Sequence, residues 1–275
     1  MQDRAFISLT TDFGAAYTAI CAGVVYSIAP SANVLVLSDE VTPYAVTEGA
    51  MLLRQALPYL PTGVHVGIVD PGVGTRRRPV AVVTGRGDVL IGPDNGLLPP
   101  AAEALGGAID AYELAHPAYR LPEVSTSFHG RDIFSPAAAH VANGLPPSAL
   151  GPRVPPGELC PLRVPPVTRD GDAVTTSALY IDRFGSLILA AGRDDLPATY
   201  AYGTPLEVAW TDRDGTPRTV RAAFAETFGS VAEGEPLVWV DSSGRLGLAV
   251  NQGSAAARFG LASDTVLTIR PAPEE

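Results

Sequence analysis

The sequence predicts an α/β domain with a parallel sheet, followed by a small all-β barrel domain. In the first half, short apolar runs alternate with longer helical stretches, which is the pattern of βαβ units. In the second half, short apolar runs are separated by turn residues, a spacing typical of a small barrel or sandwich. We therefore expect an α/β domain over 1–150, a proline-rich linker over 151–166 and a β-barrel domain over 167–275.

The first domain is expected to be Rossmann-like, with strands and helices in alternation. Pro30 and Pro58 end its first two helices, because proline cannot continue a helix. Another helix is expected to begin at Pro136, with Ser135 as its N-cap. The expected strands are 6–10, 34–37, 64–69, 80–84 and 89–92. The expected helices are 17–29, a second that begins at 44 or 46 and ends at 57, and 136–141.

An aspartate follows four of these strands: Asp12, Asp39, Asp70 and Asp94. The carboxyl ends of parallel strands meet at one edge of a sheet, so these aspartates should share a rim. Four neighbouring carboxylates repel one another unless a cation lies among them. Arg77, Arg78 or a positively charged ligand could be that cation, and each aspartate taken singly could alternatively be a helix N-cap.

The stretch from Val64 to Arg78 is the densest part of this rim. Its apolar strand ends on Asp70, and the two glycines of the Pro71–Gly74 loop let the backbone approach a ligand closely. Arginines follow at once. The local pattern leaves two interpretations open: a structural turn with solvated arginines, or a functional site.

A second dense motif runs from Ser127 to Pro136 and contains His129. This histidine stands beside a glycine, just before a helix start, so it is either structural or functional. The other histidines are expected to be structural: His65, His116 and His140. Past the proline-rich stretch, the strands of the barrel are expected at 178–181, 187–189, 206–210, 218–224, 236–240, 246–250 and 266–269.

The composition of the chain argues against several classes of function, namely nucleic-acid binding, metal binding and insertion into a membrane. The formal net charge is −10, and the chain has no lysine, which argues against a nucleic-acid partner. Cys21 and Cys160 are too few for a disulfide framework or a zinc site, and we expect no metal. No apolar run is long enough for a membrane-spanning helix, and the N-terminal residues do not resemble a signal peptide. We expect a cytoplasmic enzyme with no membrane contact.

Seven short motifs lie, in this order, at 11–14, 40–44, 70–75 with the arginines that follow, 93–96, 128–132, 182–185 and 241–244. Together they resemble the motifs of the S-adenosyl-L-methionine hydroxide adenosyltransferases, relatives of fluorinating and chlorinating enzymes. The resemblance covers nearly the whole chain. It implies that water, acting as hydroxide, attacks the ribose C5′ of S-adenosylmethionine in line and gives adenosine and L-methionine, without a cofactor.

The resemblance implies a water-handling trio of Asp70, Arg77 and His129. Asp70 or His129 would take the proton from water, and Arg77 would hold the developing hydroxide. The sequence leaves the choice of proton acceptor open. Halogenating relatives carry a tyrosine where this chain has Asp70, and a carboxylate repels a halide, so the resemblance favours hydrolysis.

The resemblance also implies that Asp12 binds the ribose hydroxyls and that Asp182 pairs with the methionine ammonium. It implies that Tyr44 and Phe228 flank the sugar and the adenine, and that Ser242 and Ser243 lie near the methionine carboxylate. The adenine edge is implied to meet Ser186, Val250, Asn251 and Gln252. The chain departs from the family pattern in a shorter loop after Gly14, in Ala22 where a lysine is usual, and in Ser186 where an asparagine is usual. A homotrimer is implied, with each active site formed by the N-terminal domain of one subunit and the C-terminal domain of the next.

Three rival functions remain at this point. A halide-using relative of the chlorinase type would make a halogenated nucleoside, and a non-catalytic sensor would bind adenosine or S-adenosylmethionine without turnover. A nucleotide-binding oxidoreductase is disfavoured, because no Gly-x-Gly-x-x-Gly follows the first strand.

Overall fold

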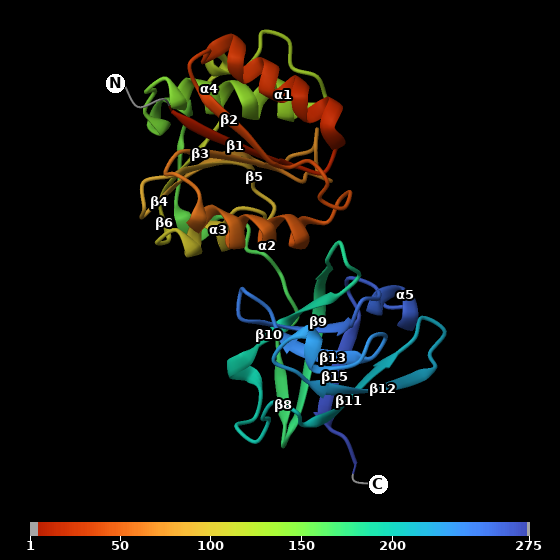
Figure 1. Ribbon diagram of the computed structural model, residues 1–275. Coiled ribbons are helices and arrows are strands. Elements are labelled where there is room, and N and C mark those ends of the chain that lie inside the picture. Colours follow the sequence, from red (N-terminus) through yellow and green to blue (C-terminus); the bar gives the residue numbers. More distant parts are fainter. Residues whose placement is uncertain (1–4, 274–275) are drawn as a thin grey trace. The chain divides into compact units, whose positions relative to one another are not determined.

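The computed structural model describes residues 5–273 and divides the chain into two compact units, Met1–Arg163 and Val164–Glu275 (Figure 1). The first unit contains a seven-stranded sheet with helices, and the second contains an eight-stranded sheet. In the part of the chain that is described, no helix is both long and apolar enough to cross a membrane.

The elements of the first unit are β1 (Phe6–Thr11), α1 (Gly14–Ile28), β2 (Asn33–Ser38), α2 (Val46–Ala56), β3 (Val64–Ile68), β4 (Pro79–Thr84), β5 (Val89–Pro93), α3 (Pro99–Ala104), β6 (Ala108–Glu113), α4 (Ser135–Ala142) and β7 (Arg153–Val154). A π-helical turn, Gly130–Phe134, leads into α4. Short 3₁₀ turns lie at Leu57–Tyr59, Pro117–Tyr119, Pro147–Leu150 and Pro156–Glu158. All the strands and helices expected here are present.

The sheet of the first unit is mixed, in the order β2-β1-β3-β5-β4-β6-β7. Strands β2, β1, β3 and β5 are parallel, so the expectation of parallel βαβ pairing is confirmed for these four. It is wrong for β4, which pairs antiparallel with β5. Residues 85–88 between them are too few for a crossover, so they form a hairpin instead.

The reversed direction of β4 places its first residues at the edge where the parallel strands end. Arg77 and Arg78 directly precede β4, so they reach the rim that carries Asp70 and Asp94. Helices α1 and α4 cover one face of the sheet, and α2 and α3 cover the other (Figure 1). The core on the α1 and α4 side includes Ile7, Leu9 and Phe134, all fully buried.

The start of α4 differs from the expectation. Ser135 is not an N-cap, because the chain is already helical from the preceding π-helical turn. Its backbone N–H and its Oγ both donate to Gly130 O, the latter at 2.7 Å. Pro136 lacks an N–H and cannot bond the carbonyl of Asp132, which instead accepts the N–H of Leu121 at 2.9 Å. A π-turn, rather than a cap, therefore precedes the helix.

The second unit consists of β8 (Thr168–Asp170), β9 (Ala173–Ile181), β10 (Leu187–Gly192), β11 (Pro205–Thr211), β12 (Pro217–Phe224), β13 (Pro236–Val240), β14 (Arg245–Val250), α5 (Ala255–Phe259) and β15 (Val266–Pro271), with 3₁₀ turns at Arg193–Asp195 and Phe228–Ser230. The sheet runs β10-β14-β13-β12-β11-β15-β9-β8, and β10 also pairs with β9. This pairing closes seven strands into a barrel, as expected. Its interior holds alternate strand residues, among them Leu187, Leu206 and Phe224.

The segment expected as a linker, 151–166, does not stand apart from the first unit. Its residues 153–154 form β7, which pairs with β6 at the edge of the sheet. The N–H of Cys160 donates to Asp94 Oδ1 at 2.7 Å. Prolines are compatible with such an edge position, because an edge strand leaves some N–H groups unpaired. The first unit therefore extends to Arg163.

Candidate active site

The rim of the first unit brings Asp70, Arg77 and His129 into direct contact. Arg77 Nε lies 2.9 Å from each oxygen of the Asp70 carboxylate, and Arg77 Nη2 donates to Asp70 Oδ2 as well. The same Nη2 lies 3.1 Å from His129 Nδ1. The two side chains of the ion pair are only 9% and 5% exposed, so water screens their interaction weakly.

These contacts define the protonation state of His129. Burial, and then the nearby charge of Arg77, lower the pKa of His129, while Asp70 and Asp132 act in the opposite sense. A guanidinium only donates hydrogen bonds, so Nδ1 must be the accepting nitrogen. The neutral ring therefore carries its proton on Nε2.

Two loops fix this arrangement. Gly74 has a φ of +76°, and a Cβ there would lie 2.4 Å from Thr126 O, so the loop after Asp70 packs tightly on the segment before His129. In that segment the N–H of Ser125 donates to Asp132 Oδ2 at 2.8 Å. Asp132 is fully buried and also pairs with Arg131, so it anchors the loop that leads into the histidine.

A second ion pair lies on the same rim. Arg78 Nε donates to Asp94 Oδ2 at 3.0 Å, and Arg78 Nη2 donates to the carbonyl of Glu158 at 2.7 Å. Each rim arginine thus neutralises one aspartate, which answers the expected need for a cation. The Arg78 pair holds the segment 158–160 against the sheet, which is a structural role.

The remaining rim aspartates contact backbone groups. Asp12 Oδ2 accepts the N–H of Tyr44 at 2.8 Å. Tyr44 has a φ of +69° and a side chain that is 74% exposed, so its ring is presented at the surface. Asp39 accepts the N–H of Gly14 through its backbone oxygen, at 3.1 Å. Asp12 and Tyr44, both expected to bind the sugar, therefore lie together.

The barrel unit has a pocket of about 560 Å³ that contains five of the expected substrate-binding residues. Its aromatic walls are Phe184, 80% exposed, and Phe228, whose ring lies 5.0 Å from that of Trp239. Phe184 was not among the expected residues, although an aromatic residue inside the 182–185 motif was a usable signal. The lining residues are Phe184, Ser186, Phe228, Val250, Asn251, Gln252 and Gly253.

Asp182 shapes the loop that forms one wall of this pocket. Its Oδ1 accepts the N–H groups of Phe184 and Ser186, each at 2.9 Å. Ser242 and Ser243 are not brought to the pocket: they lie in the hairpin between β13 and β14, where Ser243 donates to Asp241 Oδ1. That hairpin precedes β14 and the 251–253 turn follows it. The two ends of a six-residue strand such as β14 are about 17 Å apart.

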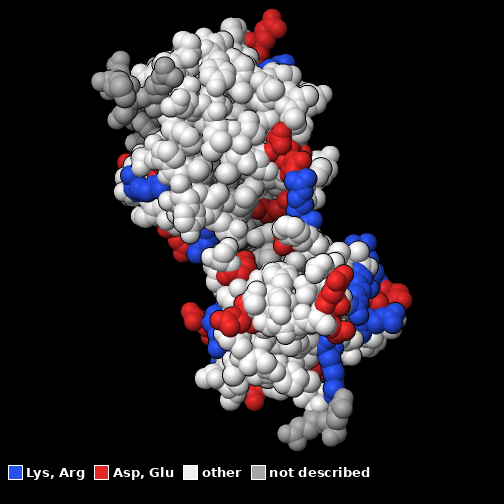
Figure 2. Space-filling model, in the orientation of Figure 1, with Lys and Arg blue, Asp and Glu red and all other residues white. Residues whose placement is uncertain are grey.

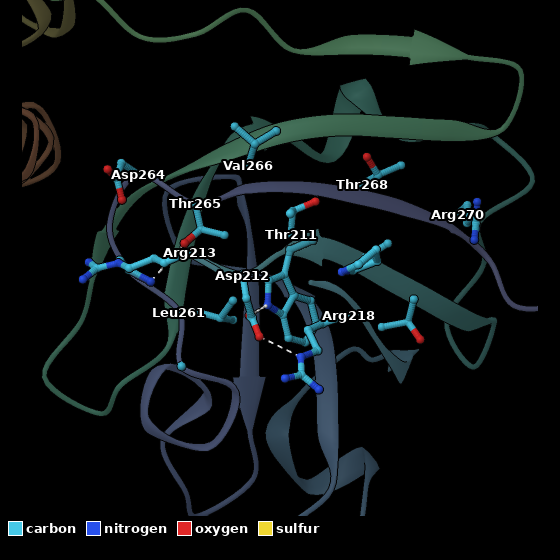
Figure 3. A pocket seen from close by; sticks show the side chains of 16 residues that line it. Thr211, Asp212, Arg213, Arg218, Leu261, Asp264, Thr265, Val266, Thr268 and Arg270 are labelled. Carbon is cyan, nitrogen blue, oxygen red and sulfur yellow. Dashed lines mark hydrogen bonds and ion pairs between the residues drawn. The ribbon is translucent and has the colours of Figure 1, made fainter. Parts of the chain in front are cut away.

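A larger hollow of about 650 Å³ lies on the barrel beside β11, β12 and β15 (Figure 3). Its arginines are largely neutralised. Arg218 pairs with Asp212 at 2.7 Å, and Arg270 donates to Glu207 at 2.8 Å. None of the expected site residues lines it.

Charged side chains are interspersed elsewhere as well. On the face shown in Figure 2, arginines lie beside acidic residues. Among residues 5–273, no three His, Cys, Asp or Glu side chains are grouped to hold a metal ion.

The fold and the site define a class: a two-unit protein with an Asp–Arg–His trio on a mixed α/β sheet and an aromatic pocket on a seven-stranded barrel. The chain belongs to the SAM (S-adenosyl-L-methionine) hydroxide adenosyltransferase family. Residues 7–151 match the family's N-terminal domain, and residues 176–268 match its C-terminal domain.

Individual relatives agree with this assignment. The chain is 44% identical over 268 residues to a protein of Salinispora tropica named (R)-S-adenosyl-L-methionine hydrolase, covering 95% of this chain and 96% of that one. It is 27% identical to a protein of an Actinoplanes species named fluorinase, covering 97% of each. A crystal structure of an uncharacterized Thermotoga maritima protein superposes with a TM-score of 0.85 at 30% identity, covering 96% of this chain and 99% of that one.

Proposed function

We propose that this chain hydrolyses S-adenosyl-L-methionine to adenosine and L-methionine. The observation that carries the proposal is the contact of Asp70, Arg77 and His129 at the rim of the first unit. The hydrolase name of the Salinispora tropica relative, at 44% identity, supports the same reaction.

The reaction needs a base that takes a proton from water, and it needs no acid to protonate the leaving group. The water oxygen forms a bond to C5′ while the C5′–S bond breaks. The electron pair of the C5′–S bond goes to sulfur. Methionine leaves as a neutral thioether, so its departure needs no proton. Water, in contrast, must lose a proton to attack effectively, and a positioned base supplies that step.

The hydrogen bonds favour Asp70 as the proton acceptor. His129 Nδ1 is occupied by Arg77, and its Nε2 already carries the proton of the neutral ring. A carboxylate has about four lone-pair positions, so Asp70 can bind Arg77 and still accept a proton from water. His129 then orients the same water through Nε2–H, and Arg77 stabilises the negative charge that develops.

The barrel pocket is proposed to hold the adenosine end of the substrate. Phe184 and Phe228 offer aromatic faces of the kind that stack on a purine. Asn251 Nδ2 donates to the carbonyl of Val231 at 2.9 Å, which fixes the amide with its oxygen available to a donor such as the adenine amino group. Ser242 and Ser243 remain proposals for the methionine carboxylate, and Asp182 for its ammonium.

As the family resemblance implies, we also propose a homotrimer in which the first unit of one subunit and the second unit of the next supply the residues of each site.

The test is incubation with S-adenosylmethionine in H₂¹⁸O, with chromatography and mass spectrometry of the products. Adenosine carrying ¹⁸O in its 5′-hydroxyl, together with methionine, is the expected result. Parallel reactions contain chloride or fluoride. A 5′-halogenated nucleoside as the main product would assign the chain to halide transfer, and substrate binding without turnover would make it a sensor.

A further inference from the structure

We propose that the π-helical turn Gly130–Phe134 is the positioning element of the trio, and that Phe134 is the residue that holds Arg77 in place. Phe134 is fully buried, and the carbon at the centre of the Arg77 guanidinium lies 5.1 Å from the centroid of its ring. The guanidinium therefore has an aromatic face on one side, and Asp70 and His129 as its hydrogen-bonding partners.

The π-turn explains how one segment supplies two neighbours of Arg77. His129 and Phe134 are five residues apart. Residues four apart share a face of an α-helix, whereas a turn closed by a bond over five residues brings the fifth residue to that side. A regular α-helical turn here would carry Phe134 away from the guanidinium while His129 stayed beside it.

Neighbouring contacts hold the turn in this form. Ser135 is fully buried and donates both its N–H and its Oγ to Gly130 O, which closes the five-residue loop twice. The carbonyl of Asp132, which Pro136 cannot bond, is taken by Leu121. The π-turn is thus built into the sequence by a serine–proline pair.

An aromatic face restrains an arginine without consuming its donors. The contact is strongest when water is excluded, and the Arg77 side chain is 9% exposed. All N–H groups of Arg77 stay free for Asp70, for His129 and for the reacting oxygen. A polar residue in place of Phe134 would compete for them.

The experiment replaces the ring with an aliphatic side chain, Phe134→Leu, and compares it with Phe224→Leu. Phe224 is a matched control: it is also fully buried and also lies under an arginine, Arg193, at 5.3 Å, but it belongs to the barrel. Both variants lose similar core packing. Only Phe134→Leu should lower kcat, by about tenfold, which corresponds to about 1.4 kcal/mol of barrier. KM should stay near the wild-type value, because no substrate contact is changed.

A second readout does not depend on turnover. Burial and, after it, the charge of Arg77 lower the pKa of His129; Arg120 also lowers this pKa, whereas Asp70 and Asp132 raise it. If Phe134→Leu lets Arg77 move away, the pKa of His129 rises, which NMR titration of the ligand-free protein measures. The His129→Gln spectrum assigns the signal among the four histidines. Phe224→Leu should leave this pKa unchanged.

The kcat prediction rests on the proposed function, whereas the titration of His129 does not. The two measurements therefore distinguish a failure of this inference from a failure of the proposed function. If the wild type does not convert S-adenosylmethionine, the proposed function fails, and the titration still tests the positioning role. The inference is overturned if Phe134→Leu keeps both the kcat and the His129 pKa of the wild type, or if Phe224→Leu lowers kcat equally. Should Phe134→Leu fold poorly, Phe134→Met fills the same space flexibly without a ring and must give the same result.

Discussion

Replacing Asp70 with asparagine tests the proton acceptor without changing the shape of the side chain. Asparagine can still accept a hydrogen bond from Arg77, but it cannot take a proton from water. A positioned general base contributes about 10²–10⁴-fold to a rate, so kcat should fall by about 100-fold or more. KM should change far less, because Asp70 acts on water and not on the bound substrate.

The substitution also has a cost in stability that must be separated from its effect on the reaction. The Asp70–Arg77 pair is nearly buried, with side chains 5% and 9% exposed, and breaking such a pair costs about 3–5 kcal/mol. Asp94→Asn provides the matched control. Asp94 is equally buried at 5%, and its partner Arg78 is 34% exposed, so the loss of stability should be smaller.

The assay measures kcat, KM and urea unfolding for both variants. Both should be less stable than the wild type, and only Asp70→Asn should lose turnover. A folded Asp70→Asn enzyme within tenfold of the wild-type kcat would refute the assignment of Asp70 as the base. Equal losses of kcat in both variants would show that the rim charges act through stability alone.

Three further predictions follow from the same geometry. The acid limb of kcat/KM should lie below pH 6.5, the ordinary pKa of histidine, because burial and Arg77 lower the pKa of His129 and a protonated ring cannot accept from Arg77; a limb above 6.5 contradicts this. Burial also lowers the pKa of His65, so the free energy of unfolding should fall as pH drops below 6.5, where the unfolded chain binds a proton that the folded chain does not. His65→Gln should flatten that dependence in urea titrations, and an unchanged slope refutes the assignment. Finally, mixed oligomers of Asp70→Ala and Phe228→Ala should regain activity at about a quarter of their sites if neighbouring subunits complete each other, whereas no recovery contradicts shared sites.

The rim could be predicted because strand ends are readable from the sequence. The apolar runs before Asp12, Asp39, Asp70 and Asp94 all became parallel strands, and these are the strands whose ends meet. The direction of β4 could not be read from its apolar residues, because a buried strand has the same composition in either direction. The short connection 85–88 was the available signal.

The pairing of each arginine with its own aspartate depended on that direction. Arg77 and Arg78 are consecutive residues entering a strand, and consecutive side chains of extended backbone point to opposite sides. One therefore reaches Asp70 and the other Asp94. Sequence reasoning offered either arginine as the single cation of the rim, whereas the structure uses both.

The π-turn was missed for a different reason. A serine followed by a proline usually marks a helix N-terminus, and the local rule predicted one. The helical turn that already runs from His129 onward overrides this rule. Within that turn, the serine and the proline stabilise the π-helical conformation and do not begin a new helix. The barrel pocket, in contrast, joins three segments far apart in sequence, 184–186, 228 and 250–253, and only the family resemblance anticipated it.

The two rim pairs also sharpen the distinction between water and halide. Arg77 neutralises Asp70, so the pair as a whole repels an anion less than an isolated carboxylate would. The stronger discrimination between water and halide comes from the proton that water carries and a halide lacks. In the proposed mechanism, water gives its proton to Asp70 as it attacks, which removes the negative charge beside the new hydroxide and leaves Arg77 free to stabilise it. A halide brings no proton, so Asp70 stays ionised and keeps Arg77 as its partner. If Asp70 is the proton acceptor, selection for water therefore depends on a side chain that can take a proton from the nucleophile more than on the charge of that side chain.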